Sequence, residues 1–206
     1  MSDWDEYAAD WDENAAVRAY ADGAFASLTS LAASIGFDLD GVAACDFGCG
    51  TGTLTDRLAD RCERIDAVDT SPAMLTVLRG KIERHGWPHV RPLGELPATP
   101  QGYGLIVCSS VLGFVDDYAT TVETLLGHLE PGGLFVQWDW EANPVDDEPY
   151  GLTRAAIART LEASGLDDVA VGIGFEVTVD GDTMRPLIGS GRRSSAPDSG
   201  RGAGGC

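Results

Sequence analysis

A glycine-rich stretch and a pair of aspartates are the residues of this sequence whose types and spacing are typical of a ligand-binding site. The stretch DFGCGTG begins at Asp46, and its glycines follow a G-x-G-x-G pattern at Gly48, Gly50 and Gly52. Glycines in such a turn let the backbone bend tightly and let a ligand approach it closely. Asp69 lies 21 residues after Gly48, at a position where a carboxylate can accept both ribose hydroxyls of an adenosine. The pattern predicts an adenosine-containing ligand.

The charge of Asp46 helps to separate two kinds of adenosine ligand. A dinucleotide places its pyrophosphate at a helix N-terminus, where the helix dipole favours an anion, and Asp46 would add a negative charge beside it. S-adenosylmethionine has no phosphate, and its ammonium and sulfonium groups are cations that a carboxylate favours. The glycine spacing also differs from the G-x-G-x-x-G of dinucleotide sites. The residues favour S-adenosylmethionine, with a dinucleotide-dependent oxidoreductase as a less favoured alternative.

Alternating strands and helices are expected to position these residues. Apolar runs predict strands at 42–47, 64–69, 89–94, 103–110 and 134–140, and two more near 167–179 and 183–190. Helical spacing and caps predict helices at 15–34, 51–62, 71–85, 116–133 and 152–164. Pro92 favours an edge position for its strand. The alternation predicts a Rossmann-like α/β fold, doubly wound, with a mostly parallel seven-stranded sheet and helices on both faces.

Three regions are expected along the chain. Residues 1–40 would form an N-terminal lid and helix, with Trp4, Tyr7 and Trp11 as candidate lid residues. Residues 41–191 would form the ligand-binding domain, in which ligands lie at the carboxyl ends of the strands. Residues 192–206 are rich in glycine and serine and lack apolar anchors, which predicts a disordered tail.

The composition restricts partners and setting. The chain has 33 acidic and 14 basic residues, a formal net charge of −19, and only one lysine, Lys81. Such a surface repels nucleic acid, and salt screens its self-repulsion, so we interpret it as an adaptation to the salty cytoplasm of a halophilic microbe. The acidic start is unlike a signal peptide, and no run reaches the length of a membrane span, so we expect a cytoplasmic protein that binds no membrane. The five cysteines lack the pattern of a metal site, and no metal is expected.

The runs DFGCGTGTLT and AVDTSPAML resemble the cofactor signature of class I S-adenosylmethionine-dependent methyltransferases. The resemblance covers residues 42–190, and the helix at 15–34 matches the N-terminal helix of the family. It implies that the methionine part of the cofactor is held by Asp46 and by the backbone of Gly48, Cys49, Gly50 and Gly52. It further implies that Asp69 holds the ribose and that the adenine is flanked by Thr70 and Met74. The loop after the third strand offers Glu95 and Leu96 to the adenine, and Ser109 lies beneath the sulfonium.

Candidates for the chemistry of methyl transfer are less specific. A base is needed only if the nucleophile must lose a proton. The candidates are Asp139 and Glu141, beyond the fifth strand, with Asp116 or Asp117 after the fourth strand as alternatives. Trp138 and Trp140 are candidate pocket residues. We expect a small-molecule methyl acceptor and a monomer or homodimer. The alternative from another class is a catalytically silent methyltransferase-like module that binds or regulates.

Overall fold

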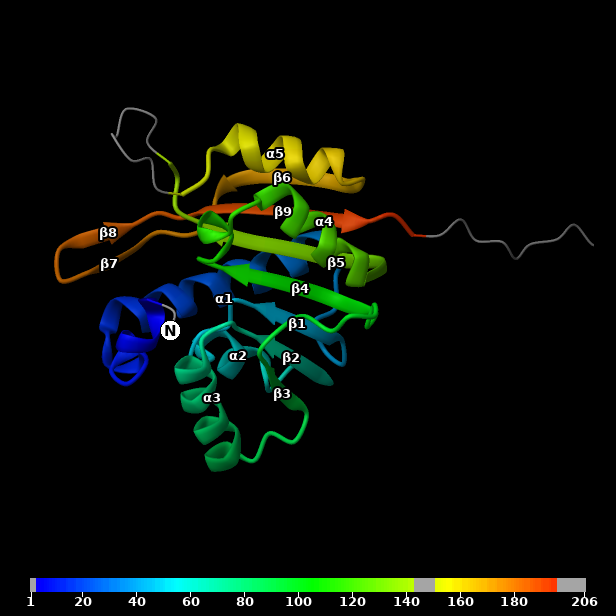
Figure 1. Ribbon diagram of the computed structural model, residues 1–206. Helices are drawn as coiled ribbons and strands as arrows, with labels where there is room; N and C mark the ends of the chain where they lie inside the picture. The colour runs from blue at the N-terminus through cyan, green and yellow to red at the C-terminus, as the bar shows by residue number, and fades with distance from the viewer. Residues whose placement is uncertain (1–2, 143–150, 196–206) are drawn as a thin grey trace, which may run out of the picture.

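The computed structural model describes residues 3–142 and 151–195 (Figure 1). Its centre is a seven-stranded sheet in the order β3-β2-β1-β4-β5-β9-β6. The strands are β1 (Ala43–Phe47), β2 (Arg64–Val68), β3 (Val90–Leu93), β4 (Tyr103–Ser109), β5 (Leu129–Asp139), β6 (Leu166–Ile173) and β9 (Leu187–Arg193). The first five run parallel, and β9 pairs antiparallel with both β5 and β6. The predicted Rossmann-like, mostly parallel sheet is confirmed.

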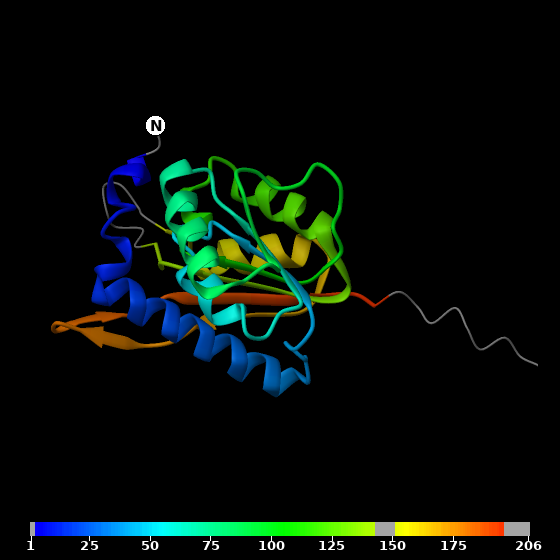
Figure 2. The same ribbon diagram turned by 90° about the horizontal axis from the view of Figure 1, so that it is seen from below.

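Helices cover both faces of this sheet (Figure 2). They are α1 (Ala15–Ile35), α2 (Thr53–Leu58), α3 (Pro72–His85), α4 (Tyr118–His128) and α5 (Arg154–Ala163). One apolar core holds buried residues of α1, α2 and α3, and a second holds those of α4 and α5. Successive strand residues alternate between these cores, since Leu105 belongs to the first and Ile106 to the second. The period of two in β4 therefore builds both cores from one apolar run.

Local caps explain where the helices begin and end. Ser71 caps α3, because its hydroxyl accepts a hydrogen bond from the backbone N–H of Met74 at 3.1 Å, and Pro72 occupies the first turn. The helix α1 ends at Gly36, which takes a left-handed φ of 64° that glycine adopts without strain. Pro92 lies in β3, at the edge of the sheet, as its missing N–H requires.

The last third of the chain differs from the prediction. Two long strands were expected near 167–179 and 183–190, whereas the structure has β6, β9 and a separate hairpin of β7 (Val177–Val179) and β8 (Asp182–Met184). The hairpin turns at Asp180 and Gly181, both with positive φ, as in a two-residue Asp-Gly turn. The strand β9 continues to Arg193, beyond the expected start of the tail at residue 192, and 196–206 lie outside the described residues.

Candidate functional site

A cavity of about 450 Å³ opens at the carboxyl ends of the parallel strands. It lies where the strand order reverses between β1 and β4, the place where doubly wound sheets bind ligands. Lining residues come from the glycine loop, the end of β2, the loop after β4, the end of β5, α1 and β8. Those predicted from the sequence are Asp46, Gly48, Cys49, Gly50, Asp69, Thr70, Met74, Ser109, Trp11 and Trp140. Most of the predicted cofactor residues are thus brought together.

The three glycines of the loop have different tasks. Each has a positive φ, which is 73° at Gly48, 54° at Gly50 and 82° at Gly52. A Cβ at Gly48 would lie 2.4 Å from the side chain of Val111, and one at Gly52 would lie 2.5 Å from that of Leu78. Those two glycines are therefore needed for packing. At Gly50 only the sulfur of Met74 comes near, at 4.0 Å, so its backbone faces open space in the cavity.

Asp46 places a buried carboxylate at the cavity. Its Oδ2 accepts a hydrogen bond from Thr55 Oγ1 at 2.6 Å, and its side chain is fully buried. Among the described residues its Oδ1 has no hydrogen-bond partner. Burial raises the pKa of Asp46 to about 6, although the hydrogen bond from Thr55 lowers it. A buried carboxylate with an unpaired oxygen favours a ligand that brings a positive charge or a hydrogen-bond donor.

Asp69 is held at the mouth of the glycine loop by its neighbours. Its Oδ2 accepts a hydrogen bond from the backbone N–H of Gly50, and its Oδ1 accepts one from Ser71, both at 2.8 Å. These bonds fix the carboxylate beside Thr70 and Met74, which also line the cavity. The second aspartate of the sequence pattern is therefore preorganised next to the first glycine turn.

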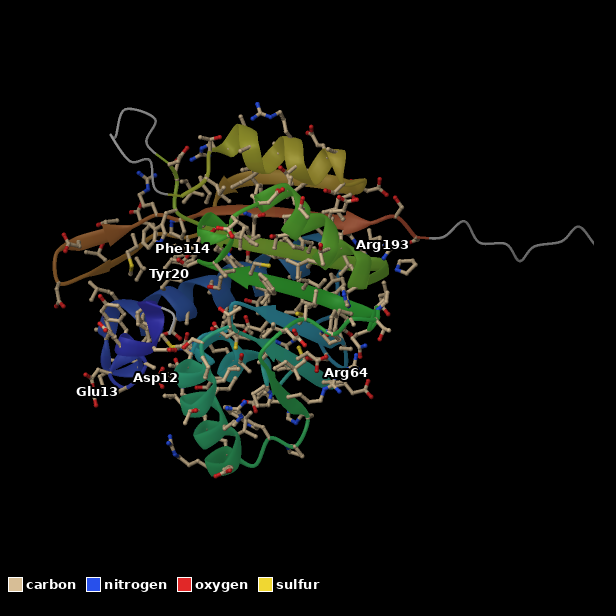
Figure 3. All side chains as sticks on the ribbon, viewed as in Figure 1. Asp12, Glu13, Tyr20, Arg64, Phe114 and Arg193 are labelled. Carbon is tan, nitrogen blue, oxygen red and sulfur yellow. The ribbon has the colours of Figure 1, made fainter. Side chains whose placement is uncertain are left out.

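An N-terminal segment, residues 3–13, packs against α1 and α3 at the cavity, and we call it the strap. Trp11 of the strap lines the cavity. Asp12 accepts a hydrogen bond from Thr51 Oγ1 and forms an ion pair with Lys81 Nζ, both at 2.6 Å. Figure 3 shows Asp12 near the blue end of the chain, at the end of the sheet where the cavity opens. Of the other candidate lid residues, Tyr7 is 58% exposed and does not line the cavity, and the Trp4 side chain lies outside the described part.

Three predicted cofactor residues lie outside the cavity lining. Gly52 begins α2 and packs against Leu78 rather than facing the cavity. Glu95 is exposed in the loop after β3, which is an edge strand of the sheet. Leu96 lines a separate hollow against α4.

The two candidate bases are also placed elsewhere. Glu141 is 44% exposed and forms an ion pair with Arg154 at 2.8 Å. Asp139 is buried beneath the lining, where its Oδ1 accepts the backbone N–H of Gly113 at 3.0 Å and its Oδ2 accepts Gln137 Nε2 at 2.9 Å. Burial raises the pKa of Asp139 to about 7. Asp139 therefore anchors the 3₁₀ turn η3 (Leu112–Phe114), whose Phe114 lines the cavity.

Sequence reasoning missed several lining residues. Tyr20 of α1, Phe114 of η3 and Met184 of β8 meet in the cavity from distant parts of the chain, so no local pattern marks them. Trp140 lines the cavity as expected, whereas Trp138 is fully buried behind it and packs in the core. No helix in the described ranges 3–142 and 151–195 is long and apolar enough to cross a membrane.

Comparisons with known proteins agree with this geometry. A family model described as a methyltransferase domain matches residues 45–135. A ubiquinone biosynthesis O-methyltransferase of Methylobacterium sp. (strain 4-46) is 33% identical over 184 residues, which are 78% of this chain and 70% of the relative. A trans-aconitate 2-methyltransferase of Azoarcus sp. (strain BH72) is 32% identical over 126 residues, 60% of this chain. The chain spans about half the length of this second relative, since the match covers 48% of it.

Solved structures show the same fold. The N-methyltransferase NodS from Bradyrhizobium japonicum WM9, in complex with S-adenosylhomocysteine, has a TM-score of 0.68 and 20% identity, covering 88% of this chain and 89% of NodS. A methyltransferase in complex with the Haloferax volcanii Trm112 activator has a TM-score of 0.73 and 18% identity, covering 94% and 99%. Both are similar in architecture across nearly the whole described fold.

Proposed function

Because the chain belongs to the class I S-adenosylmethionine-dependent methyltransferases, with S-adenosylmethionine as methyl donor, we propose that it methylates a small-molecule acceptor by in-line displacement. The observation that carries this proposal is the buried carboxylate of Asp46, which lines the cavity and whose Oδ1 has no hydrogen-bond partner among the described residues. The donor brings an ammonium and a sulfonium to that site. A cationic ligand supplies the charge that the described lining lacks.

The lining residues fit the parts of the donor. In our proposal Asp46 and the backbone around Gly50 hold the methionine part, since Gly50 leaves open space above the loop. Asp69 holds the ribose hydroxyls from its fixed position at the end of β2. Thr70 and Met74 flank the adenine on the same side of the cavity.

In the proposed reaction these residues mainly position the donor and the acceptor and compensate the charge of the donor. The donor supplies a methyl group on cationic sulfur: the acceptor's lone pair forms the new bond, the carbon–sulfur pair stays on sulfur, and the acceptor's proton passes to solvent. Holding the acceptor and the methyl group in line contributes much of such a rate enhancement. We propose that Asp139 acts as a positioning residue for η3, because its carboxylate binds Gly113 rather than lining the cavity. Glu141, paired with Arg154, has no proposed role in proton transfer.

The Asp69→Ala variant tests this assignment. We expect it to weaken S-adenosylhomocysteine binding by about 1.5–3 kcal/mol, the range for hydrogen bonds that involve a charged group. Isothermal titration calorimetry measures this loss, with Asp60→Ala, an exposed aspartate that does not line the cavity, as control. An unchanged affinity in Asp69→Ala would remove this residue from the site, and tight NADH binding without S-adenosylhomocysteine binding would replace the proposal with the dinucleotide alternative.

Turnover separates an enzyme from a silent binding module. Conversion of S-adenosylmethionine to S-adenosylhomocysteine, stimulated by an added acceptor, is the expected result. Binding of the donor with no stimulated turnover across a broad metabolite panel would favour the silent module. The acidic chain, with its net charge of −19, is unsuited to nucleic acid as acceptor.

The acidic surface also predicts a salt dependence. We propose a cytoplasmic protein, monomer or homodimer, adapted to high salt, because 33 acidic residues face only 14 basic ones. Lowering potassium chloride from about 2 M to about 0.1 M lengthens the screening distance from roughly 2 to 10 Å and strengthens the self-repulsion. The melting temperature is expected to fall over that range. A melting temperature that does not change with salt would contradict the halophilic interpretation.

A further inference from the structure

The order of the strands divides the cavity into two sides. Asp69, Thr70 and Met74 follow β2, on one side of the central β1. Ser110 and Phe114 follow β4, and Trp140 follows β5, on the other side. The β2 side carries the residues proposed for the adenosine. The β4–β5 side is therefore the place for the methyl acceptor, and we call it the acceptor side.

Aromatic rings dominate the acceptor side. Tyr20 of α1 packs at 5.6 Å, centroid to centroid, from Trp140, with the rings tilted by 48°. Phe114 lines the cavity from η3, and Met184 lines it from the β7–β8 hairpin. Figure 3 labels Tyr20 and Phe114 at the end of the sheet where the cavity opens, and both line the cavity. Flat apolar rings and a thioether offer stacking and dispersion contacts to another flat ring.

Cationic side chains are absent from the described lining. The charged residues that line the cavity are the acids Asp46 and Asp69. Three cations outside the lining form ion pairs with acidic side chains: Lys81 pairs with Asp12, Arg154 with Glu141 and Arg185 with Glu176.

A further observation points the same way. Arg64 and Arg193 lie at the opposite end of the sheet (Figure 3). A carboxylate acceptor would therefore meet negative charge without a counter-ion, which costs free energy in a partly buried site.

Ser110 adds one fixed polar group to the acceptor side. Its backbone has a φ of 56°, a left-handed conformation that is uncommon for a residue with a side chain. The backbone N–H donates to the carbonyl of Trp138 at 2.7 Å, and the indole N–H of Trp140 donates to its Oγ at 3.1 Å. The hydroxyl oxygen thus accepts one hydrogen bond from Trp140, and the hydroxyl hydrogen remains to be donated.

We propose that the methyl acceptor is a flat, uncharged aromatic compound with a hydroxyl or amino group. It packs against Tyr20, Phe114 and Trp140 and accepts a hydrogen bond from Ser110. This inference rests on the proposed function and narrows its substrate class. It separates this chain from its trans-aconitate methyltransferase relatives, because a tricarboxylate has no counter-ion in the described lining.

Binding to the complex with S-adenosylhomocysteine tests the inference independently of turnover. The probes are 1-naphthol and 1-naphthylamine as flat uncharged aromatics, and trans-aconitate as the tricarboxylate. We expect either aromatic probe to bind at least tenfold more tightly than trans-aconitate in calorimetry. We also expect the aromatic probe that binds to stimulate formation of S-adenosylhomocysteine from S-adenosylmethionine more than trans-aconitate does.

Variants connect that preference to the named residues. Trp140→Ala is expected to weaken binding of the aromatic probe at least fivefold more than it weakens S-adenosylhomocysteine binding. Ser110→Ala is expected to weaken the aromatic probe about threefold, since it keeps the backbone and removes one hydroxyl. Trp87→Ala is the matched control, because Trp87 stacks on His85 away from the cavity, and it is expected to leave probe binding unchanged.

The outcomes separate the two levels of the proposal. Tighter binding of trans-aconitate, or no binding of either aromatic probe while S-adenosylhomocysteine still binds, overturns the acceptor class and leaves the methyltransferase function standing. Equal effects of Trp140→Ala and Trp87→Ala also overturn it. A wild-type chain that does not bind S-adenosylhomocysteine overturns the proposed function and the acceptor class together.

Discussion

Two buried aspartates on neighbouring strands have opposite surroundings. Asp66 of β2 lies opposite Cys45 of β1 in the register, one residue before Asp46. Both carboxylates are fully buried. Asp66 accepts a two-pronged pair of hydrogen bonds from Arg91 and one from Tyr103, all at 2.6–2.7 Å. Asp46 accepts one from Thr55 and, among the residues described, has an oxygen left over.

The contrast separates a structural carboxylate from a ligand-binding one. Burial raises the pKa of Asp66, but the hydrogen bonds from Arg91 and Tyr103 outweigh that effect and hold it below its ordinary value. Burial raises the pKa of Asp46 to about 6, and the described neighbours provide no counter-ion. The charge of Asp66, which does not line the cavity, is therefore compensated within the protein. The charge of Asp46, which lines the cavity, is available to a ligand. Burial alone does not mark function, whereas burial without compensation does.

The largest expected effect is on stability, in Asp66→Ala. Removing this carboxylate leaves the buried hydroxyl of Tyr103 and the half-exposed guanidinium of Arg91 without their partner. We expect the free energy of unfolding to fall by about 2–4 kcal/mol, measured by urea denaturation. Asp60→Ala, on the exposed surface, is expected to change it by less than about 0.5 kcal/mol. A loss no larger than that of the control would show that the Asp66 network does not stabilise the fold.

The next largest effect is expected for Asp46→Asn, which should raise the stability of the fold and lower the affinity for S-adenosylhomocysteine. The amide removes a charge whose folded pKa is raised, so the carboxylate's cost is absent below about pH 4 and grows as the pH rises through about 6. The variant is expected to melt at a higher temperature than wild type at pH 8. Its affinity for S-adenosylhomocysteine is expected to fall about tenfold. Unchanged affinity would mean that Asp46 is as structural as Asp66.

The smallest effect is a change in pH dependence, in Asp139→Asn. Burial raises the pKa of Asp139 in the folded protein to about 7. The protonated side chain therefore contributes its full share to the stability of the fold below about pH 4, and this contribution is lost as the pH rises through 7. The difference in melting temperature between the variant and wild type is therefore expected to move in favour of the variant between pH 5 and pH 8. Parallel pH profiles would show that Gly113 and Gln137 compensate the ionised carboxylate fully.

Local patterns predicted the parts of the molecule that depend on neighbours in sequence. The alternating runs predicted the seven strands of the main sheet, and the spacing of Asp46, Gly50 and Asp69 predicted residues that line one cavity. The turn of the β7–β8 hairpin at Asp180-Gly181 falls between the two expected strands, whereas the breaks that separate β6 from β7 and β8 from β9 were missed. Gly174 and Pro186, which lie in those breaks, are the residues that interrupt a strand pattern.

Contacts between distant segments could not be predicted in this way. Tyr20, Phe114 and Met184 meet only because α1, η3 and β8 pack at one end of the sheet. Glu95 follows β3 as the resemblance requires, yet its loop turns toward solvent at the edge of the sheet. The direction of such a loop depends on tertiary packing rather than on residue spacing.

The ion pair between Lys81 of α3 and Asp12 of the strap offers a way to follow movement of the strap. Lys81 is the sole lysine of the chain, and its ammonium is covered by Asp12, with 10% of the side chain exposed. An amine-reactive dye therefore has one side-chain target, which it reaches when Asp12 lifts away. The rate of labelling would measure how often the ion pair between Lys81 and Asp12 breaks. Movement of the strap can therefore be followed in the unmodified sequence.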